Sequence, residues 1–408
     1  MSGPTGYADI EIIVPQSGGA KLGQGGYGCT FRPPLICQGR QQRRPPPDRV
    51  GKVTSHEDAS IEISFARYFR NVPNAKKYLW LPHIDTYCKP APLQQQNDKS
   101  SIIKCKEKVL KDHPNESFIL EQKRHFEMDY GGIPLSDFAH NIPREFDFFK
   151  YMRQVLEIGA FLVLHGVVHN DLHSGNVLMD KSYTPRLIDY GRSYIIASFD
   201  HKRQGDLKAY FKASLGQIPP EMSMMDGDDF GHSKEYMIGE FQKGNPVMKD
   251  YMEKLLGVPR SRQLTELKAF WSSSVAVQKK DWLTFYKLYW PVVDSWAIGS
   301  MIMKIYRKMI LSKSFTDSAA WKEREASFKM ILRGLLRASP RNRLDCMEAL
   351  FLYDPTNELV TSAAGVAWLE KRQSYRKGQK GGGTGAAAIA PDADDGDDYD
   401  DDPFGDFD

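Results

Sequence analysis

The sequence predicts an α+β fold in which a β-rich N-terminal part, residues 20–130, precedes a helical C-terminal part, residues 131–376. Short strand-like runs such as Cys29-Thr30-Phe31 are bounded by glycine and proline and gather in the first part. Helix-compatible runs such as 249–256 and 264–270 lie in the second part. The 408 residues, 41% hydrophobic and 26% charged, are typical of a globular protein with two or three domain-sized units.

The first strand-like region contains the glycine pattern G-x-G-x-x-G. Its residues are Gly23, Gln24, Gly25, Gly26, Tyr27 and Gly28. Glycine tolerates positive φ and has no Cβ, so backbone N–H groups in such a loop can approach phosphates closely. A dinucleotide-binding loop would open a helix, but a strand follows here and Pro33-Pro34 excludes a helix. We therefore expect a hairpin that covers phosphates.

A second strand and a helix follow the hairpin. Residues 49–53 are predicted as a strand that carries Lys52. Residues 57–69 are predicted as a helix, because apolar residues recur at the spacing of one buried helical face. Those residues are Ile61, Phe65 and Phe69.

Candidate catalytic and metal-binding residues lie in the segment His169-Asn170-Asp171-Leu172-His173-Ser174-Gly175-Asn176. It is followed by Asp189-Tyr190-Gly191, directly after the strand-like run 186–188. Asp171 can hold a substrate hydroxyl and take its proton, while Asn176 and Asp189 can hold magnesium that bridges nucleotide phosphates. This combination is typical of phosphoryl transfer.

Together these motifs resemble the protein kinase superfamily, where they occur in the same order. The resemblance implies a two-lobed protein-kinase-like fold, a β-rich N-lobe and a helical C-lobe with ATP between them. It implies that ATP and Mg²⁺ are the cofactors and that protein serine or threonine hydroxyls accept the γ-phosphate. Lys52 is then the residue that orients the phosphates, with Glu62 as its carboxylate partner and Glu57 as the alternative.

The resemblance also assigns an adenine-binding segment. Residues 126–132 are similar to the strand and hinge that join the two kinase lobes. Met128 would line the back of the adenine pocket. The backbone of Asp129, Tyr130 and Gly131 would bind the adenine edge.

Further matches occur downstream. Pro219-Pro220-Glu221 resembles the element that closes the kinase activation segment, and residues 294–299 resemble the start of the central C-lobe helix. In Pro340-Arg341-Asn342-Arg343, the last arginine is the implied partner of Glu221 in a buried ion pair. The resemblance covers about four fifths of the chain.

Three positions depart from the kinase pattern. Asn170 replaces an arginine that grips a phosphorylated activation loop in many kinases. His173 replaces a lysine near the transferred phosphate, which would make the charge there dependent on pH. Tyr190 replaces a phenylalanine and can fill the same packing role. The string H-x-D-L-H-x-G-N is closer to aminoglycoside- and choline-kinase-like enzymes, so a small-molecule kinase is one alternative, and a catalytically silent scaffold or virion protein is another.

The glycine loop, the run Phe31-Arg32-Pro33-Pro34-Leu35 and the segment 169–176 together resemble divergent serine/threonine kinases of nucleocytoplasmic large DNA viruses. This resemblance implies a kinase that acts in the host cytoplasm or is packaged in the virion. Viral core or capsid proteins are the implied substrates. The sequence contains no motif for specific nucleic-acid binding.

Extensions and insertions surround these motifs. Residues 1–19 form an N-terminal extension, 37–48 an exposed basic loop, and 222–290 an inserted helical region that either docks substrate or covers the C-lobe. Residues 377–408 form a tail, with a glycine-rich linker at 378–385 and an acidic, disordered tract at 392–408. The ten aspartates after Ala390 leave the preceding chain at +13. The tail either only solvates the chain or folds onto a basic face.

Composition disfavours other classes of protein. Residues 1–14 lack the pattern of a signal peptide, and the densest apolar stretch, 158–168, is far shorter than the ~20 residues of a membrane span. We expect a soluble protein. The five cysteines include no C-x-x-C pair, so we expect reduced thiols and no zinc site.

Overall fold

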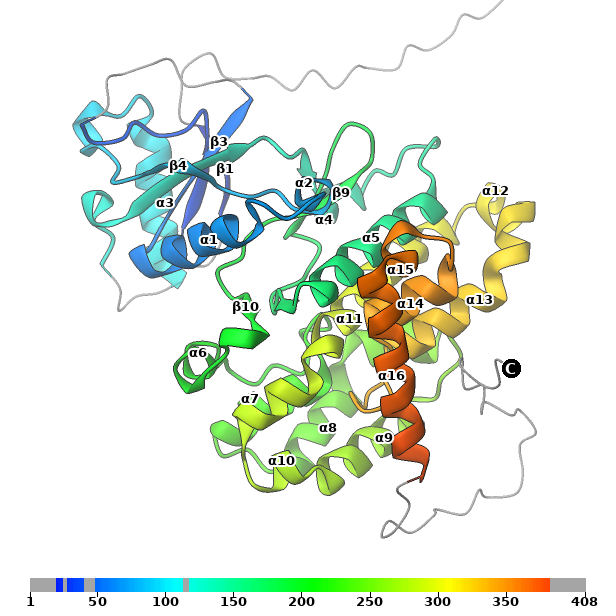
Figure 1. Ribbon diagram of the computed structural model, residues 1–408. Helices are drawn as coiled ribbons and strands as arrows, with labels where there is room; N and C mark the ends of the chain where they lie inside the picture. Colours follow the sequence, from blue (N-terminus) through cyan, green and yellow to red (C-terminus); the bar gives the residue numbers. More distant parts are fainter. Residues whose placement is uncertain (1–19, 25–27, 40–47, 113–116, 382–408) are drawn as a thin grey trace, which may run out of the picture. The chain divides into compact units, whose positions relative to one another are not determined.

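The computed structural model describes residues 20–24, 28–39, 48–112 and 117–381 (Figure 1). Internal contacts divide the chain into two compact units, which are described separately below. Unit 1 consists of Met1–Lys76 and Trp80–Gly131, and unit 2 of Lys77–Leu79 and Gly132–Asp408. The fold is mixed α+β, as predicted: a five-stranded antiparallel sheet lies in unit 1, and unit 2 is mainly helical.

Unit 1 is built on a sheet with strand order β1-β2-β3-β5-β4. Its strands are β1 (Ala20–Gln24), β2 (Cys29–Arg32), β3 (Arg49–Thr54), β4 (His83–Cys88) and β5 (Arg124–Asp129). Gln24 opposite Cys29 closes the β1–β2 pair, so the predicted hairpin at the glycine pattern is confirmed. Strand β3 is central, which places Lys52 between Thr30 of β2 and Phe126 of β5.

Helix α1 (His56–Phe69) follows β3 directly. The side chain of Ser55 caps it by accepting the backbone N–H of Asp58, which satisfies one donor of the first turn. Phe65 and Phe69 are buried, as predicted. The third predicted core residue, Ile61, is only half-buried, and the helix instead buries Glu62, Ile63 and Ala66. The buried face is therefore rotated from the predicted one, because Glu62 turns inward.

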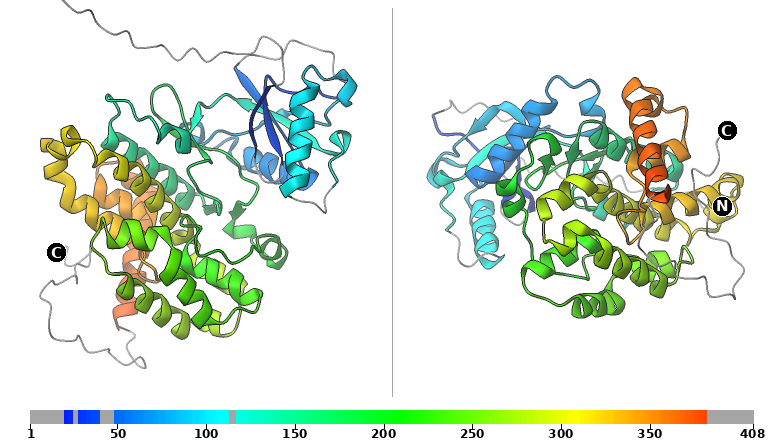
Figure 2. Two further views of the ribbon diagram at one scale, coloured as in Figure 1. Left: turned by 180° about the vertical axis from the view of Figure 1, so that it is seen from behind. Right: turned by 60° about the horizontal axis from the view of Figure 1, so that its bottom comes forward.

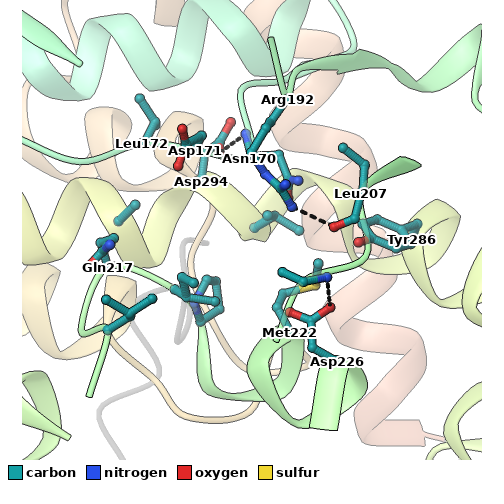
Figure 3. A pocket seen from close by; sticks show the side chains of 16 residues that line it. Asn170, Asp171, Leu172, Arg192, Leu207, Gln217, Met222, Asp226, Tyr286 and Asp294 are labelled. Carbon is teal, nitrogen blue, oxygen red and sulfur yellow. Dashed lines mark hydrogen bonds between the residues drawn. The ribbon is translucent and has the colours of Figure 1, made fainter. Parts of the chain in front are cut away.

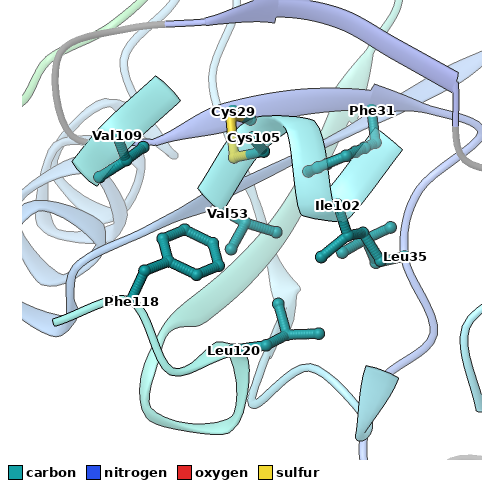
Figure 4. Close-up of a cluster of buried hydrophobic side chains, with 9 residues drawn as sticks. All are labelled: Cys29, Phe31, Leu35, Val53, Ile102, Cys105, Val109, Phe118 and Leu120. Atoms are coloured by element: carbon teal, nitrogen blue, oxygen red, sulfur yellow. A yellow bond between two sulfur atoms is a disulfide. The ribbon is translucent and has the colours of Figure 1, made fainter. Parts of the chain in front are cut away.

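Helix α3 (Lys99–Asp112) packs on the other face of the sheet. Side chains alternate along a strand, so Val53 points away from the face that carries Lys52. It joins a buried cluster that links the sheet to α3 (Figure 4). The cluster consists of Cys29, Phe31, Leu35, Val53, Ile102, Cys105, Val109, Phe118 and Leu120.

The prediction of reduced thiols is wrong for four of the five cysteines. Disulfides join Cys29 to Cys105 and Cys37 to Cys88, with Cα–Cα distances of 6.1 and 5.9 Å. The partners are 76 and 51 residues apart in sequence, so they meet only when the sheet and α3 assemble. Cys346 has a free thiol and is buried in unit 2.

The long helices of unit 2 are α5 (Phe148–Leu164), α11 (Trp282–Met309), α13 (Ala319–Leu335), α14 (Cys346–Tyr353) and α16 (Ala363–Gly381). Helix α5 packs against α11 and α14, and α13 packs against the same two helices (Figure 2). A Cβ on Gly159 of α5 would collide with Cys346 and Ile298, so this close approach of helices requires glycine.

Short strands in unit 2 bracket the segment 169–176. Strand β7 (Val167–Val168) pairs with β10 (Tyr194–Ile195), and β8 (Val177–Met179) pairs with β6 (Ile133–Pro134) and β9 (Pro185–Leu187). The remaining short elements are α2 (Ala75–Tyr78), α4 (Leu135–Phe138), α6 (His201–Asp206), α12 (Lys313–Thr316), α15 (Glu358–Thr361) and the 3₁₀ turns η1 (Leu93–Gln95), η2 (Leu120–Gln122) and η3 (Ile196–Ser198).

The predicted inserted region is helical. It contains α7 (Pro220–Asp229), α8 (Lys234–Gly244), the π-helix η4 (Val247–Glu253), α9 (Arg260–Ser273) and α10 (Val275–Gln278). The helices expected at 249–256 and 264–270 correspond to η4 and α9, whereas α8 was not foreseen.

Helix α11 does not start at Asp294, as the resemblance implied. It begins at Trp282, where the side chain of Asp281 caps it by accepting the N–H of Thr284. Pro291 lies inside the helix without ending it. Asp294 is therefore a mid-helix residue, and its carboxylate is turned toward the loop at 169–176.

The predicted ion pair between Arg343 and Glu221 is confirmed. Two guanidinium nitrogens of Arg343 each lie 2.7 Å from a carboxylate oxygen of Glu221, and both side chains are buried. The pair joins the start of α7 to the segment before α14.

At the C-terminal end, α16 continues to Gly381, so the start of the predicted glycine-rich linker is helical. The rest of the tail, residues 1–19 and most of the predicted basic loop lie outside the described residues. Every described helix is too short or too polar to cross a bilayer.

Candidate active site

Asp294 anchors the loop at 169–176 in unit 2. Its carboxylate accepts the backbone N–H of His169 at 2.6 Å and that of Asn170 at 3.0 Å. The imidazole Nε2 of His169 lies 3.0 Å from the carbonyl oxygen of Ile188, and Asn170 has a positive φ of 59°. A buried carboxylate in the middle of α11 therefore holds the sharp turn that precedes Asp171.

Asp171 and Asn176 are joined within this loop. The side-chain amide of Asn176 donates to the backbone carbonyl of Asp171 at 2.9 Å and to its carboxylate at 3.3 Å. Since the Nδ2 of Asn176 is used in this way, the Oδ1 atom is the one it can offer to a cation. The structure thus brings two of the predicted site residues together.

Asp189 is linked to the same loop through the backbone. The N–H of Ile188 donates to the carbonyl of Asn176 at 3.0 Å, and the next residue, Asp189, has a positive φ of 68°. Tyr190 is fully buried, and its hydroxyl donates to the carbonyl of Leu187 at 2.9 Å. A tyrosine therefore fills this core position, and its hydroxyl has a partner.

The electrostatics of the loop combine burial with charge. Burial raises the pKa of Asp171, the charge of Asp189 raises it further, and His173 and His169 oppose the shift. Burial lowers the pKa of His173, against the attraction of Asp171. The Nδ1 of His173 accepts the N–H of Gly175 at 2.9 Å, so the neutral imidazole carries its proton on Nε2.

In unit 1, Lys52 forms an ion pair with Glu62. The ammonium nitrogen lies 2.6 Å from Oε1, and the Glu62 side chain is 1% exposed. Of the two carboxylates that the sequence offered, the pair uses Glu62 and not Glu57. A buried ion pair on α1 holds the lysine side chain on one face of β3.

The described part of the glycine pattern is Gly23, Gln24 and Gly28. Gly25, Gly26 and Tyr27 lie outside the described residues. A Cβ on Gly28 would collide with the carbonyl oxygen of Val53, so the return from the loop to β2 requires glycine.

The predicted adenine-binding segment ends β5. Met128 is buried, the carboxylate of Asp129 lies 2.9 Å from the Nε2 of His83, and Gly131 is the last residue of unit 1. The backbone N–H of Tyr130 donates to the carbonyl of Asp48 at 2.7 Å. That N–H is therefore already used within unit 1, which the sequence did not indicate.

A pocket of about 240 Å³ opens beside Asp171 within unit 2 (Figure 3). Arg192, Asp226 and Tyr286 line it together with Asp171. Arg192 donates to the carbonyl of Leu207 at 2.5 Å, and burial raises the pKa of Asp226 to about 7. Sequence reasoning missed these residues: Arg192 directly follows the Asp189-Tyr190-Gly191 motif and could have been found, but no local pattern marks Asp226 or Tyr286.

Comparison with known proteins gives a partial match. No family model matches the chain. A region of 108 residues, 25% of the chain, is 27% identical to the serine/threonine-protein kinase PKH3 of Eremothecium gossypii. The match spans 15% of that kinase's length. It supports a relationship to a protein kinase over this region.

Proposed function

We propose that this chain is an ATP- and Mg²⁺-dependent protein kinase that transfers the γ-phosphate to serine or threonine hydroxyls. One observation carries the proposal: Asp171 and Asn176 share a hydrogen-bonded loop that buried Asp294 anchors, and Asp189 is joined to it through Ile188. The partial similarity to a serine/threonine kinase points in the same direction.

The residues present fit a magnesium ion. Mg²⁺ prefers oxygen ligands and is usually held by one or two carboxylates together with substrate phosphates. Asp189 offers a carboxylate, and Asn176 offers Oδ1 because its Nδ2 is bonded to Asp171. When bound, the ion neutralises charge on the nucleotide phosphates.

Asp171 is the proposed acceptor-binding residue. A hydroxyl that enters the pocket beside it can donate its hydrogen bond to the carboxylate, which orients the oxygen for attack and takes its proton. The pKa of Asp171 is raised by burial, and the positive charge that His173 and His169 carry when protonated favours the ionised form. Most of the catalysis in such a site comes from positioning and electrostatics.

Lys52 is the proposed ligand of the α- and β-phosphates. Its pairing with Glu62 holds the ammonium in one orientation, and the glycine-rich hairpin continues directly from the neighbouring strand β2. We further propose that the backbone around Asp129 binds adenine, through groups other than the Tyr130 N–H.

The test is transfer of label from γ-labelled ATP with Mg²⁺ to a basic and an acidic protein. The wild-type chain is compared with Asp171→Ala, Asp189→Ala and the control Asp317→Ala, which alters an exposed carboxylate. We expect label on protein for the wild type and the control, and its loss in both site variants while each remains folded. A folded, active Asp189→Ala protein would contradict the metal role.

Other outcomes of this assay identify the alternatives. If ATP binds and is consumed only with amino-sugar or choline acceptors, the chain is a small-molecule kinase. The pattern H-x-D-L-H-x-G-N, which contains His173, favours this alternative. If ATP does not bind, the chain is a scaffold with a kinase-like sequence.

The setting of the reaction is also a proposal. From the resemblance to kinases of large DNA viruses, we propose that the chain acts in the host cytoplasm or is packaged in the virion, on viral core or capsid proteins. Detection of the chain in purified virions and in the cytoplasmic fraction would test this. Its absence from both would reject the assignment without affecting the proposed chemistry.

A further inference from the structure

Cys37, Cys88 and His125 meet at one point of unit 1. The Nδ1 of His125 lies 3.7 Å from the sulfur of Cys37 and 3.6 Å from that of Cys88. One potential ligand atom from each of the three residues lies within 4.8 Å of the others. Cys37 and His125 are buried, whereas Cys88 is half-buried, so a small ion has a path in from solvent.

The backbone holds this cluster in place. Cys88 at the end of β4 lies opposite His125 on β5, and Cys37 lies opposite Pro90 in an isolated bridge. A Cβ on Gly51 would collide with the Nε2 of His125, so glycine at this position makes room for the imidazole.

The cluster lies on the face of the sheet opposite the Lys52–Glu62 pair. His125 is the cross-strand partner of Val53, and cross-strand partners share a face, while Lys52 points to the other face. The cluster is therefore separate from the residues that we propose for phosphate binding, and the inference that follows does not depend on kinase activity.

The second cysteine pair provides an internal comparison. Cys29 and Cys105 are both fully buried among apolar side chains (Figure 4), and the described part of the chain places no histidine in that cluster. That pair has the surroundings of a structural disulfide. The Cys37–Cys88 pair differs because an imidazole nitrogen faces both sulfurs.

We propose that Cys37, Cys88 and His125 form a zinc site in the reduced protein. Two thiolates and an imidazole are ligands that zinc prefers, with water completing the tetrahedron. With Zn–S of about 2.3 Å and Zn–N of about 2.0 Å, tetrahedral geometry separates sulfur from nitrogen by about 3.5 Å. In the oxidised form described here, each sulfur already lies near that separation from Nδ1, at 3.7 and 3.6 Å. The two sulfurs are bonded to each other in this form, so reduction must let them move apart to occupy separate tetrahedral positions.

The zinc form and the disulfide exclude each other. A dithiol reductant gives two electrons and two protons to the S–S bond, yields two thiols and becomes a disulfide itself. Each thiol then loses its proton as it binds Zn²⁺, so metal binding releases two protons and is stronger at higher pH. Oxidation of the thiolates to the disulfide removes two of the three ligands and releases the ion.

Cobalt(II) titration of the reduced full-length chain tests this proposal. We expect one tight Co²⁺ site with sulfur-to-cobalt charge-transfer absorption, which Zn²⁺ abolishes by displacement. Cys88→Ser and His125→Gln should each weaken binding by about 100-fold or more, since a ligand is lost. The double variant Cys29→Ser/Cys105→Ser should retain the absorption and is the matched control.

Wild-type protein oxidised to the Cys37–Cys88 disulfide is a control that needs no substitution, and it should bind no cobalt. Zinc should also raise the Tm of the reduced wild type but not that of Cys88→Ser, with circular dichroism used to check that each variant folds. Absence of the absorption in folded, reduced wild type, or its persistence in both Cys88→Ser and Cys37→Ser, would overturn the proposal.

Discussion

At the residue scale, buried carboxylates position both the proposed acceptor-binding residue, Asp171, and the proposed phosphate-binding residue, Lys52. Asp294 fixes the backbone before Asp171, and Glu62 fixes the side chain of Lys52. Neither carboxylate is proposed to touch a substrate. Each instead holds another residue in place, and its contacts offset part of the cost of burying a carboxylate.

Substitutions at Lys52 and Glu62 can distinguish the contribution of Lys52 to stability from its contribution to phosphate transfer. Lys52→Met removes the ammonium that pairs with buried Glu62, so we expect the free energy of unfolding to fall by about 3–5 kcal/mol. Adding Glu62→Gln removes the buried charge and should restore most of that stability, while phosphate transfer stays at least about 100-fold below wild type. Urea unfolding and the labelled-ATP assay measure the two quantities. Recovery of activity in the double variant would contradict the role of Lys52.

The raised pKa of Asp226 predicts that the stability of the folded protein depends on pH. Burial raises its pKa to about 7 from an ordinary value of 3.8. Between these pH values the folded protein binds more protons than the unfolded chain, so the contribution of Asp226 to stability falls as pH rises from about 4 to 7. Asp226→Asn can still accept the Ala209 N–H and should raise the free energy of unfolding at pH 8 by up to about 4 kcal/mol, with little effect at pH 4.

Denaturant unfolding of Asp226→Asn at both pH values is the measurement, with the exposed Asp317→Asn as control. An equal increase in the free energy of unfolding of Asp226→Asn at pH 4 and pH 8 would show that altered packing, and not loss of the Asp226 charge, causes the increase.

At the element scale, unit 2 is held together by contacts between helices far apart in sequence. Arg343, before α14, pairs with Glu221 in the first turn of α7 and also donates to the carbonyl of Val292 in α11. Three elements therefore depend on one guanidinium. The same helix α11 supplies Asp294 to the loop at 169–176.

The Glu221–Arg343 pair should be costly to break. Glu221→Gln leaves the buried guanidinium without its carboxylate, and we expect a loss of about 3–5 kcal/mol in the free energy of unfolding of the chain. Glu325→Gln breaks a solvent-exposed pair with Lys329 and should cost less than about 1 kcal/mol. Parallel denaturant curves compare the two. A similar cost for both would mean that the buried pair contributes no more than a surface one.

At the scale of the whole molecule, the C-terminal tail and the rest of the chain carry opposite net charges. The ten aspartates after Ala390 oppose a net charge of +13 on the rest. Such a tail either solvates the protein or competes with acidic partners for a basic face. Salt screens the attraction between tail and face, so only in the second case would removal of the tail change how activity depends on ionic strength.

We expect the tail to be dispensable for transfer. Removal of residues 382–408 should leave kcat/KM for basic and acidic protein substrates within about twofold of the full chain, because exposed charges interact weakly in salt. Kinetics at low and physiological ionic strength measure this. A truncated chain that is several-fold faster on acidic substrates at low salt, with the difference lost at higher salt, would indicate an autoinhibitory tail instead.

Most of the elements that were predicted correctly have local determinants, and the Arg343–Glu221 pair is a long-range prediction that succeeded because a motif resemblance implied it. The β1–β2 hairpin, strand β3 and helix α1 follow from glycine, proline and apolar spacing within short windows. The start of α11 was misplaced because Asp294 suggested a boundary, whereas the cap is Asp281. The site residues Asp171, Asn176 and Lys52 were chosen from motifs, and their catalytic roles stay predictions.

The sequence by itself determined the α+β character and the order of the motifs. The resemblance carried by those motifs implied the Arg343–Glu221 pair and offered Glu62 and Glu57 as partners of Lys52, and the structure selected Glu62. Only the tertiary structure decided the cysteine chemistry, since whether two thiols meet depends on strand register and helix packing across 51 and 76 residues. It also decided that Asp294 of α11 and Asp226 of α7 line the pocket beside Asp171, because their burial and contacts arise from packing of helices distant in the sequence. Local propensity sets the elements, but burial and proximity are properties of the assembled chain.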